Sequence, residues 1–441
     1  MHERRWHHFG RYCGQHYGPY YGWINLVGLM LVYGSLCGNI TYAYGVFLPS
    51  MAESFNWSRS ALSGPYTLFF IIGGLLGPAA GMTIGRFGAR KNIIFCNLLA
   101  VVGLFGMSKV NAVWHLYICF GLIIGIVIAF GEFIPITSVI NNWFVRKRSL
   151  AMGLLFTAGG IGGFLMPSVI GGLITAHGWQ QAWAWLAGSH LVLAVVMGGL
   201  IIRNHPNDVG LEVDGRYPHP EARTPPAALE TQLHPVEIDW TVREALRSPA
   251  LWMIVALFSI ILFATNILGT HQVAYLQDLG FSPIGSAAAL GMMLGCSIIG
   301  RLLCGVLGMR RDGRWLAASF LTGMGLGILC LMSARSIHFI YAYSILTGIG
   351  FGGMIVLMPQ LLSHYFGRAN YARILGWTIP VVTLVSAAGP VLAGALYDAT
   401  GKYDIPLAIT VAAIAAGIAI SARMPARSDH NLKPKHLPAM P

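Results

Sequence analysis

The sequence predicts an all-α membrane protein with twelve transmembrane helices in two six-helix, pseudo-symmetric halves. Of its 441 residues, 55% are hydrophobic and only 10% are charged, whereas soluble domains carry about 25% charged residues. Apolar runs of about 20 residues recur along the chain, each long enough to cross a bilayer core of about 30 Å. Matching features also recur at matching places in the two halves, which indicates a duplicated bundle.

The predicted elements follow a polar tail at residues 1–21 that is rich in His and Tyr. The N-terminal half, 22–202, holds spans at 22–48, 60–82, 92–109, 114–142, 150–174 and 180–202. The C-terminal half, 249–424, holds spans at 249–276, 284–307, 315–334, 337–363, 374–397 and 403–422, before a second tail at 425–441. Between the halves, the polar, Pro-rich stretch 203–248 is interpreted as a linker, in which IDWTVREALRSP predicts a short interfacial helix.

The two halves repeat each other in their turns and in their helices. GMTIGRFGARK follows the second span and GVLGMRRDGR follows the eighth. WFVRKRSLAMG precedes the fifth span and YFGRANYARILG precedes the eleventh. Pro167 stands four residues before Gly171 in the fifth span, as Pro390 does before Gly394 in the eleventh. Duplicated bundles of this kind bind their substrate between the halves, near mid-membrane.

The basic residues predict the orientation. Of the 28 Lys and Arg residues, 23 fall on one side of the predicted spans and 4 on the other, with Arg301 inside a span. Because positive charge accumulates on the cytoplasmic side, we expect both tails and the linker to be cytoplasmic, in a bacterial-type inner (plasma) membrane. The net charge of +12 is spread over short turns, so we expect no nucleic-acid binding. The 7 cysteines show no CxxC spacing, and no nucleotide-binding or catalytic motif is apparent, so we expect no enzyme, metal or cofactor.

Arg301 is the basic residue that does not fall in a predicted turn or tail on either side of the membrane. It lies within the eighth span, where a lone Arg costs between about 2.5 and well over 10 kcal/mol. One interpretation is a snorkelling side chain, because Arg301 lies about seven residues, or roughly 10 Å, from the basic turn. The other is an anchor for a carboxylate, since a guanidinium offers a planar, bidentate fit and stays charged.

Glu132, in IAFGEFIPITS, is the acid that lies deep in a span. A carboxylate at that depth either pairs with a cation or takes up a proton. Three interpretations follow: a counter-ion to Arg301, a proton-carrying group for symport, or a protonated Glu bonded to a neighbouring helix.

Other polar residues are candidates for the walls of a binding site. Asn39, Tyr42 and Tyr44 form a polar, aromatic face on the first span, although Tyr at helix ends also anchors spans at the interface. His271, in the outer half of the seventh span, is either a gate or proton relay or a hydrogen-bonded wall residue.

GMTIGRFGARK resembles the helix 2–3 turn of the major facilitator superfamily, G-x-x-x-D-R-x-G-R-K, with Gly85 in place of the Asp. That Asp is credited with clamping the halves of family members; the second copy of the turn keeps an acid, Asp312, in a shifted register. Within the superfamily, the chain resembles the monocarboxylate transporters and the oxalate:formate antiporters. The resemblance is carried by YYGW, TYAYGVFLPSMAESFNWSRSALS, WFVRKRSLAMGL and GRLLCGVLG, and covers about residues 20–200 and 250–424.

This resemblance implies the major facilitator fold, and a role for Arg301, because the eighth helix of that group carries an Arg that pairs with the substrate carboxylate. It also implies that the face formed by Asn39, Tyr42 and Tyr44 contributes to the site. The chain departs from the animal transporters at Ser297, where they have an Asp, and from the oxalate antiporters in lacking a basic residue in the eleventh span. A dianion held by two cations is therefore disfavoured.

The resulting hypothesis is a monomeric secondary active transporter of a small monocarboxylate, coupled to protons, that works by alternating access in the lipid bilayer. Its binding residues would be Arg301, Asn39, Tyr42, Tyr44 and His271, with Glu132 as the proton-coupling group. The alternatives are a carrier of another organic anion or of a drug by antiport, and a membrane sensor that does not transport.

Overall fold

The computed structural model describes residues 20–55, 57, 59–215, 240–281 and 283–425. Within these residues, every regular element is a helix. Eleven helices in the described residues are long and apolar enough to cross a membrane, and the bent pair Gly64–Leu75 with Gly77–Phe87, counted as one span, makes a twelfth. This confirms the predicted all-α membrane fold. The predictions for residues 1–19, 216–239 and 426–441 lie outside the described residues.

The N-terminal half begins at Tyr21 and is built from fourteen helical segments, several of which join end to end into one span. They are α2 (Tyr21–Leu36), η1 (Cys37–Thr41), α3 (Tyr44–Phe55), α4 (Arg59–Leu75), α5 (Gly77–Phe87), α6 (Ala89–Met107), α7 (Val113–Leu116), η2 (Tyr117–Ile124), α8 (Gly125–Gly131), α9 (Phe133–Trp143), α10 (Arg148–His177), α11 (Trp179–His190), η3 (Leu191–Met197) and α12 (Gly198–Ile201).

Two short 3₁₀ turns, η4 (Pro206–Val209) and η5 (Val213–Gly215), begin the connection to the C-terminal half. The helices beyond it are α14 (Val242–Arg247), α15 (Pro249–Asp278), α16 (Pro283–Leu307), α17 (Gly313–Met332), α18 (Ile337–Phe366), α19 (Tyr371–Thr400) and α20 (Asp404–Arg423). The short helix expected in IDWTVREALRSP is α14, which begins at a capping box: the Glu244 amide donates to Thr241 Oγ1, and the Thr241 amide donates to the Glu244 carboxylate.

Within the described residues, three of the predicted spans are interrupted, the first of them at residues 42–43, between η1 and α3. The second bends by 52° between α4 and α5, where Pro78 cannot donate a backbone hydrogen bond to the preceding turn. The fourth breaks at Glu132, whose φ of −110° and ψ of −106° are not helical and separate α8 from α9. The break at Glu132 therefore places a carboxylate at an interruption of the helical backbone.

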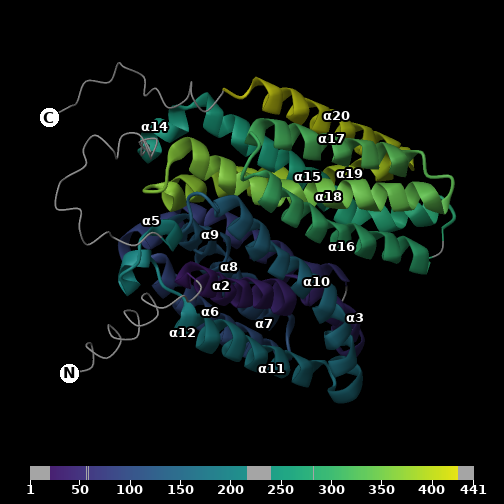
Figure 1. Ribbon diagram of the computed structural model, residues 1–441. Helices are drawn as coiled ribbons and strands as arrows, with labels where there is room; N and C mark the ends of the chain where they lie inside the picture. The colour runs from purple at the N-terminus through teal and green to yellow at the C-terminus, as the bar shows by residue number, and fades with distance from the viewer. Residues whose placement is uncertain (1–19, 56, 58, 216–239, 282, 426–441) are drawn as a thin grey trace, which may run out of the picture.

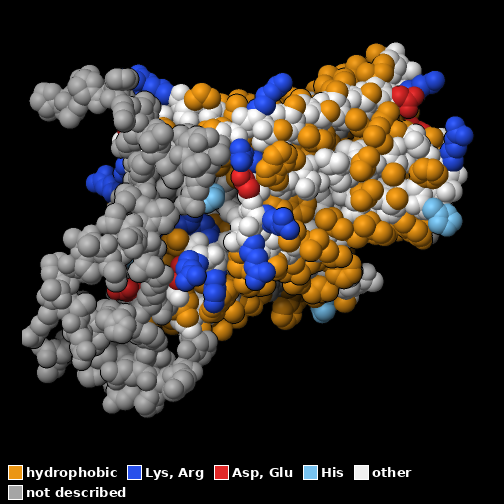
Figure 2. All heavy atoms as spheres, turned by 45° about the horizontal axis from the view of Figure 1, so that its top comes forward, with side chains coloured by type: hydrophobic (Ala, Val, Ile, Leu, Met, Phe, Trp, Pro, Cys, Tyr) orange, Lys and Arg blue, Asp and Glu red, His pale blue; other side chains and the backbone are white. Residues whose placement is uncertain are grey.

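The two halves lie side by side, with the N-terminal half in purple to teal and the C-terminal half in green to yellow (Figure 1). Their contact runs mainly along two helix pairs, α10 with α16 and α5 with α19. The turns after α5, α9, α16 and α18, together with the helix ends that flank them, carry just over half of the described Lys and Arg residues and lie at one end of the bundle, which we call the basic end. In Figure 2, Lys and Arg side chains are more frequent towards the left than at the right-hand end, and hydrophobic side chains cover much of the surface between.

Near the basic end, the two halves are in close contact. The Ser149 hydroxyl on α10 lies 3.0 Å from the Cys304 carbonyl oxygen and 2.9 Å from Gln360 Oε1, both in the C-terminal half. Glycine lets the backbones meet: a Cβ added at Gly153 would lie 2.9 Å from the Cα of Gly305. These contacts close the basic end.

Towards the opposite end, α10 and α16 diverge. A Cβ added at Gly171 or Gly172 on α10, or at Gly291 or Gly295 on α16, would meet no heavy atom within 4 Å. The described conformation therefore joins the halves at the basic end and leaves these two helices apart at the other.

Candidate functional site

Arg301 lies at the contact between the halves. It belongs to α16, is 5% exposed, and its Nη1 donates a 2.8 Å hydrogen bond to the carbonyl oxygen of Phe156 on α10. Gly160 makes room for the guanidinium, because a Cβ there would lie 2.5 Å from Nη1. The Arg301 side chain thus crosses to the other half instead of extending along α16 towards the basic end.

Within the described residues, no carboxylate neutralises the guanidinium in this conformation. Arg301 Nε is buried and has no hydrogen-bond partner among the described residues. Nor does Arg301 form an ion pair with any carboxylate within 4.0 Å in the described part of the chain. A buried cation with an unused donor can accept an anion, and a carboxylate satisfies a guanidinium through two parallel hydrogen bonds.

Aromatic and thiol side chains of the first span surround this guanidinium. Tyr42 lies beside Arg301, and its ring packs on Gly163 of α10. A Cβ at Gly159 would lie 2.5 Å from the Tyr33 ring and 3.0 Å from Cys37 Sγ. Tyr33 and Tyr42 are both half-buried.

Glu132 completes the same group of side chains. Its Oε1 lies 3.8 Å from Cys37 Sγ, and its carboxylate acts electrostatically on both Tyr33 and Tyr42, as Arg301 does. We call these five residues, Tyr33, Cys37, Tyr42, Glu132 and Arg301, the Arg301 cluster. Glu132 does not pair with Arg301 here, so the counter-ion arrangement is not formed in this conformation.

Sequence reasoning missed Tyr33 and Cys37. The signal that points to them is the run AGGIGG at 158–163, whose glycines leave space along one stretch of α10. Glycine removes the side chain at a helix contact, so a Gly-rich stretch marks where a neighbouring helix or a bulky side chain approaches.

Asn39 points away from the Arg301 cluster, into the N-terminal half. It is 2% exposed, and its Nδ2 donates to Ser35 Oγ at 3.1 Å and to Ser189 Oγ at 3.0 Å. The same Ser35 hydroxyl lies 2.7 Å from Nδ1 of His190, which is fully buried. This polar network ties the first span to α11.

Tyr44 likewise packs within the N-terminal half. It is 1% exposed, its hydroxyl donates a 2.7 Å hydrogen bond to the Leu62 carbonyl oxygen, and its ring stacks on Tyr66 with centroids 5.5 Å apart. In this conformation, Asn39 and Tyr44 do not join Tyr42 beside Arg301.

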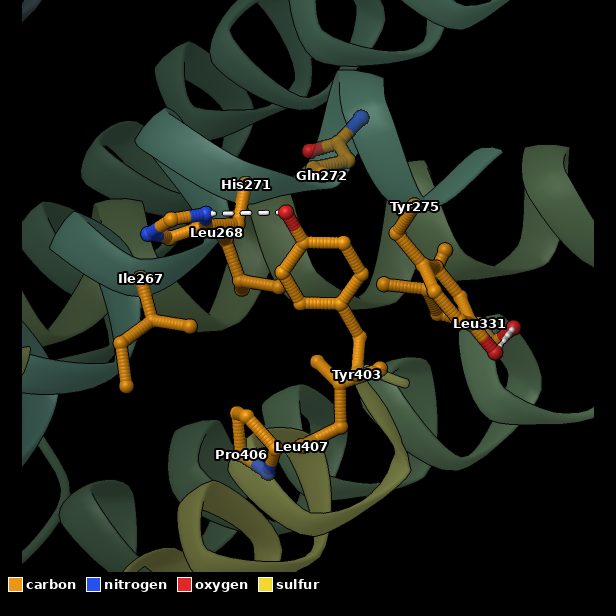
Figure 3. Close-up of a pocket in the computed structure, with 9 residues that line it drawn as sticks. All are labelled: Ile267, Leu268, His271, Gln272, Tyr275, Leu331, Tyr403, Pro406 and Leu407. Atoms are coloured by element: carbon orange, nitrogen blue, oxygen red, sulfur yellow. Dashed lines mark hydrogen bonds between the residues drawn. The ribbon is translucent and has the colours of Figure 1, made fainter. Parts of the chain in front are cut away.

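His271 belongs to α15 in the C-terminal half, and its ring points towards Tyr403, the residue before α20 (Figure 3). Its Nε2 is 3.0 Å from the Pro390 carbonyl oxygen, and its Nδ1 is 3.3 Å from the Tyr403 hydroxyl. A carbonyl oxygen can only accept, so Nε2 carries the proton, and in the neutral ring Nδ1 accepts from Tyr403.

The cavity beside His271 is small. Its volume is about 10 Å³, room for about one water molecule. It is lined by Ile267, Leu268, His271, Gln272, Tyr275, Leu331, Tyr403, Pro406 and Leu407. His271 is therefore a hydrogen-bonded wall residue of the C-terminal half in this conformation, separate from the Arg301 cluster.

Comparisons with known proteins agree with this architecture. A family model described as Major Facilitator Superfamily matches residues 29–321 and, in a second match, residues 289–439. Monocarboxylate transporter 13 of Bos taurus is 26% identical over 409 residues, covering 92% of this chain and 90% of the relative. Monocarboxylate transporter 12 of Rattus norvegicus is 22% identical, covering 87% and 81%. Monocarboxylate transporter 2 of Homo sapiens is 24% identical, covering 94% and 89%.

Proposed function

Because the chain belongs to the major facilitator superfamily and is related to the monocarboxylate transporters, we propose that it carries a small monocarboxylate across the membrane by alternating access, with Arg301 as the anchor for the carboxylate. The observation that carries this proposal is the buried guanidinium of Arg301 at the contact between the halves, with a free Nε and no carboxylate partner among the described residues.

The substrate would replace the contact that Arg301 now makes. Nη1 donates to the Phe156 carbonyl oxygen, which is a neutral acceptor. A carboxylate accepting from Nε and an Nη atom forms charge-assisted hydrogen bonds that are roughly twice as strong as neutral ones. Tyr42 lies beside the guanidinium, and its hydroxyl would donate a hydrogen bond to the same carboxylate.

Glu132 would supply the coupling to protons. Arg301 with a bound carboxylate is electrically neutral, whereas an ionised Glu132 in the same cluster adds a charge in a site that closes on every cycle. The cost of that charge rises as water leaves and the local dielectric constant falls. A proton on Glu132 removes it, so substrate and proton would cross together.

We further propose that the basic end faces the cytoplasm, as the distribution of Lys and Arg favours. The described conformation would then be closed to the cytoplasm, with α10 and α16 apart on the external side. We place the protein in the plasma membrane as a monomer; the bacterial type of that membrane stays a prediction from the sequence.

The test is uptake of labelled lactate, pyruvate, formate and oxalate into proteoliposomes under a pH gradient, comparing wild type with Arg301→Ala and Arg301→Lys. We expect uptake of at least one monocarboxylate, its loss in Arg301→Ala, and a reduction of about tenfold or more in Arg301→Lys, because an ammonium keeps the charge but not the planar fork. Arg310→Ala, in an exposed turn at the basic end, is the matched control.

Equal uptake by Arg301→Ala and wild type would contradict the anchoring role. Transport only of larger organic anions or drugs, in exchange for a second solute, would favour the antiporter alternative.

A further inference from the structure

A second candidate site lies at the basic end, away from the Arg301 cluster, in an open groove between α5 and α19. The groove has a volume of about 660 Å³. It is lined by Met82, Gly85, Arg86, Val242, Arg373 and Trp377. The transport mechanism proposed above uses none of these residues.

Two guanidinium groups reach this groove from opposite halves. Arg86 belongs to the last turn of α5, and Arg373 to the first turn of α19. A Cβ added at Gly85 would lie 2.8 Å from Arg373 Nε, so the Arg373 side chain lies over the backbone next to Arg86. In the described part of the chain, neither arginine forms an ion pair within 4.0 Å. Two neighbouring cations without a carboxylate favour a bound anion.

The groove also has an apolar wall. The side chains of Trp377 and Met82 are 47% and 53% exposed. Each lies one helical turn further from the basic end than the arginine on its own helix. Trp is favoured at the depth of lipid headgroups, and basic pockets between spans bind anionic headgroups. An amphipathic anion fits this combination better than a free inorganic ion does.

We propose that this groove binds the headgroup of an anionic phospholipid, and that the bound lipid holds the basic end closed. The phosphate would lie between Arg86 and Arg373, with an acyl chain along Trp377 and Met82. This proposal does not depend on the identity of the transported substrate.

The link to conformation follows from where the groove lies. α5 belongs to the N-terminal half and α19 to the C-terminal half, and they touch through glycine: a Cβ at Gly81 would lie 2.5 Å from the Ala372 carbonyl oxygen. When the halves separate at the basic end, the two guanidinium groups separate as well. A lipid that binds only the joined arrangement shifts the population towards it.

The first experiment measures binding to the purified full-length chain in neutral detergent. Thermal unfolding is followed during titration with short-chain phosphatidylglycerol, phosphatidylcholine or inorganic phosphate, for wild type and the double variant Arg86→Gln/Arg373→Gln. We expect phosphatidylglycerol to raise the Tm of wild type, and the double variant to bind it about 25-fold more weakly, about fivefold for each arginine.

The controls separate the groove from general surface charge. Arg310→Gln removes a positive charge from the same end but outside the groove and should bind as wild type does, and Arg86→Lys/Arg373→Lys should recover most of the affinity. Equal stabilisation by phosphatidylcholine or inorganic phosphate, or an equal loss of binding in Arg310→Gln, would overturn the proposal.

An acidic segment of the chain is the competing occupant. Residues 216–239, outside the described part, include Glu221, Glu230, Glu237 and Asp239. If changing these four to amides lowers the Tm in phosphatidylcholine as much as the double Arg→Gln variant does, the linker fills the groove and the lipid proposal is wrong. If the amide variant keeps both the Tm and the response to phosphatidylglycerol, the proposal stands.

Discussion

At the scale of single residues, Arg301 and Glu132 stand in different electrostatic situations although both are charged groups in membrane spans. Arg301 is 5% exposed and donates to a backbone carbonyl of the opposite half, whereas Glu132 is half-buried at a helix break and contacts Cys37. Because the Arg301 guanidinium and the Glu132 carboxylate form no ion pair with each other, each can interact with a different partner. The proposed function assigns a carboxylate to Arg301 and a proton to Glu132.

We predict that Glu132→Gln uncouples transport from protons. Gln is neutral at every pH, so it stands for a permanently protonated Glu132. The variant should lose acceleration of uptake by an inward proton gradient and still exchange labelled for unlabelled substrate at a rate close to that of wild type. Parallel measurements of gradient-driven uptake and of exchange in proteoliposomes decide this. Gradient-driven uptake that survives in Glu132→Gln would exclude Glu132 as the proton carrier.

At the scale of helices, glycines decide how closely the elements approach. A Cβ at Gly352 on α18 would collide with the carbonyl oxygen of Ser297 on α16, whereas a Cβ at Gly172 on α10 meets open space. Backbone atoms cannot rotate away as a side chain can. The two positions therefore give a matched pair for testing the packing.

We predict that Gly352→Ala lowers stability by about 1–3 kcal/mol through overpacking, whereas Gly172→Ala leaves stability unchanged or raises it by up to about 1 kcal/mol. The Tm of each variant in detergent measures this. A Tm for Gly352→Ala equal to that of wild type would mean that α16 and α18 are not in the close contact described.

Asp312, the acid kept in the second copy of the repeated turn, caps a helix. Its Oδ1 accepts from the Arg314 amide at 2.9 Å at the start of α17, and its Oδ2 accepts from Arg314 Nη2 at 2.8 Å. The hydrogen bond from the Arg314 side chain holds the pKa of the Asp312 carboxylate below its ordinary value. The acid thus acts within the C-terminal half, at the end of one helix.

We predict that Asp312→Ala costs about 1 kcal/mol at neutral pH, the usual effect of losing an N-cap. Because the folded-state pKa is lowered, this stabilisation is present above the ordinary Asp pKa of about 3.9 and is lost as pH falls through the folded value. The difference in Tm between wild type and variant should therefore shrink in acid. A difference that is unchanged in acid would contradict an electrostatic contribution, and Asp278→Ala, at an exposed helix end, is the control.

At the scale of the whole molecule, the contacts between the halves are unequal at the two ends. Ser149 is 3% exposed within the closed basic end, whereas Gly172, further along the same helix, is exposed. Alternating access requires this inequality to reverse during each cycle.

We predict that, in a background without native cysteines, a maleimide labels Gly172→Cys rapidly and Ser149→Cys slowly, and that added substrate raises the rate at Ser149→Cys. Labelling in detergent, quantified by mass spectrometry, measures both rates. Equal rates at the two positions in the absence of substrate would contradict the described closure.

The sequence by itself determined the all-α class, the number of spans, the duplication and the family, because hydropathy, charge distribution and short motifs are local properties that can be read along the chain. It also singled out Arg301 and Glu132, since a charge inside an apolar run is visible without a structure.

Only the tertiary structure decided what these charges touch. The sequence grouped Asn39, Tyr42 and Tyr44 on one face, yet only Tyr42 lies beside Arg301. The reason is that η1 is a π-helical segment, whose wider turn changes the direction in which successive side chains point relative to an α-helix. Likewise, Tyr33 reaches the Arg301 cluster through space left by Gly159 of another helix. Which side chains meet depends on the bends and close approaches of helices distant in sequence, and no local pattern specifies those.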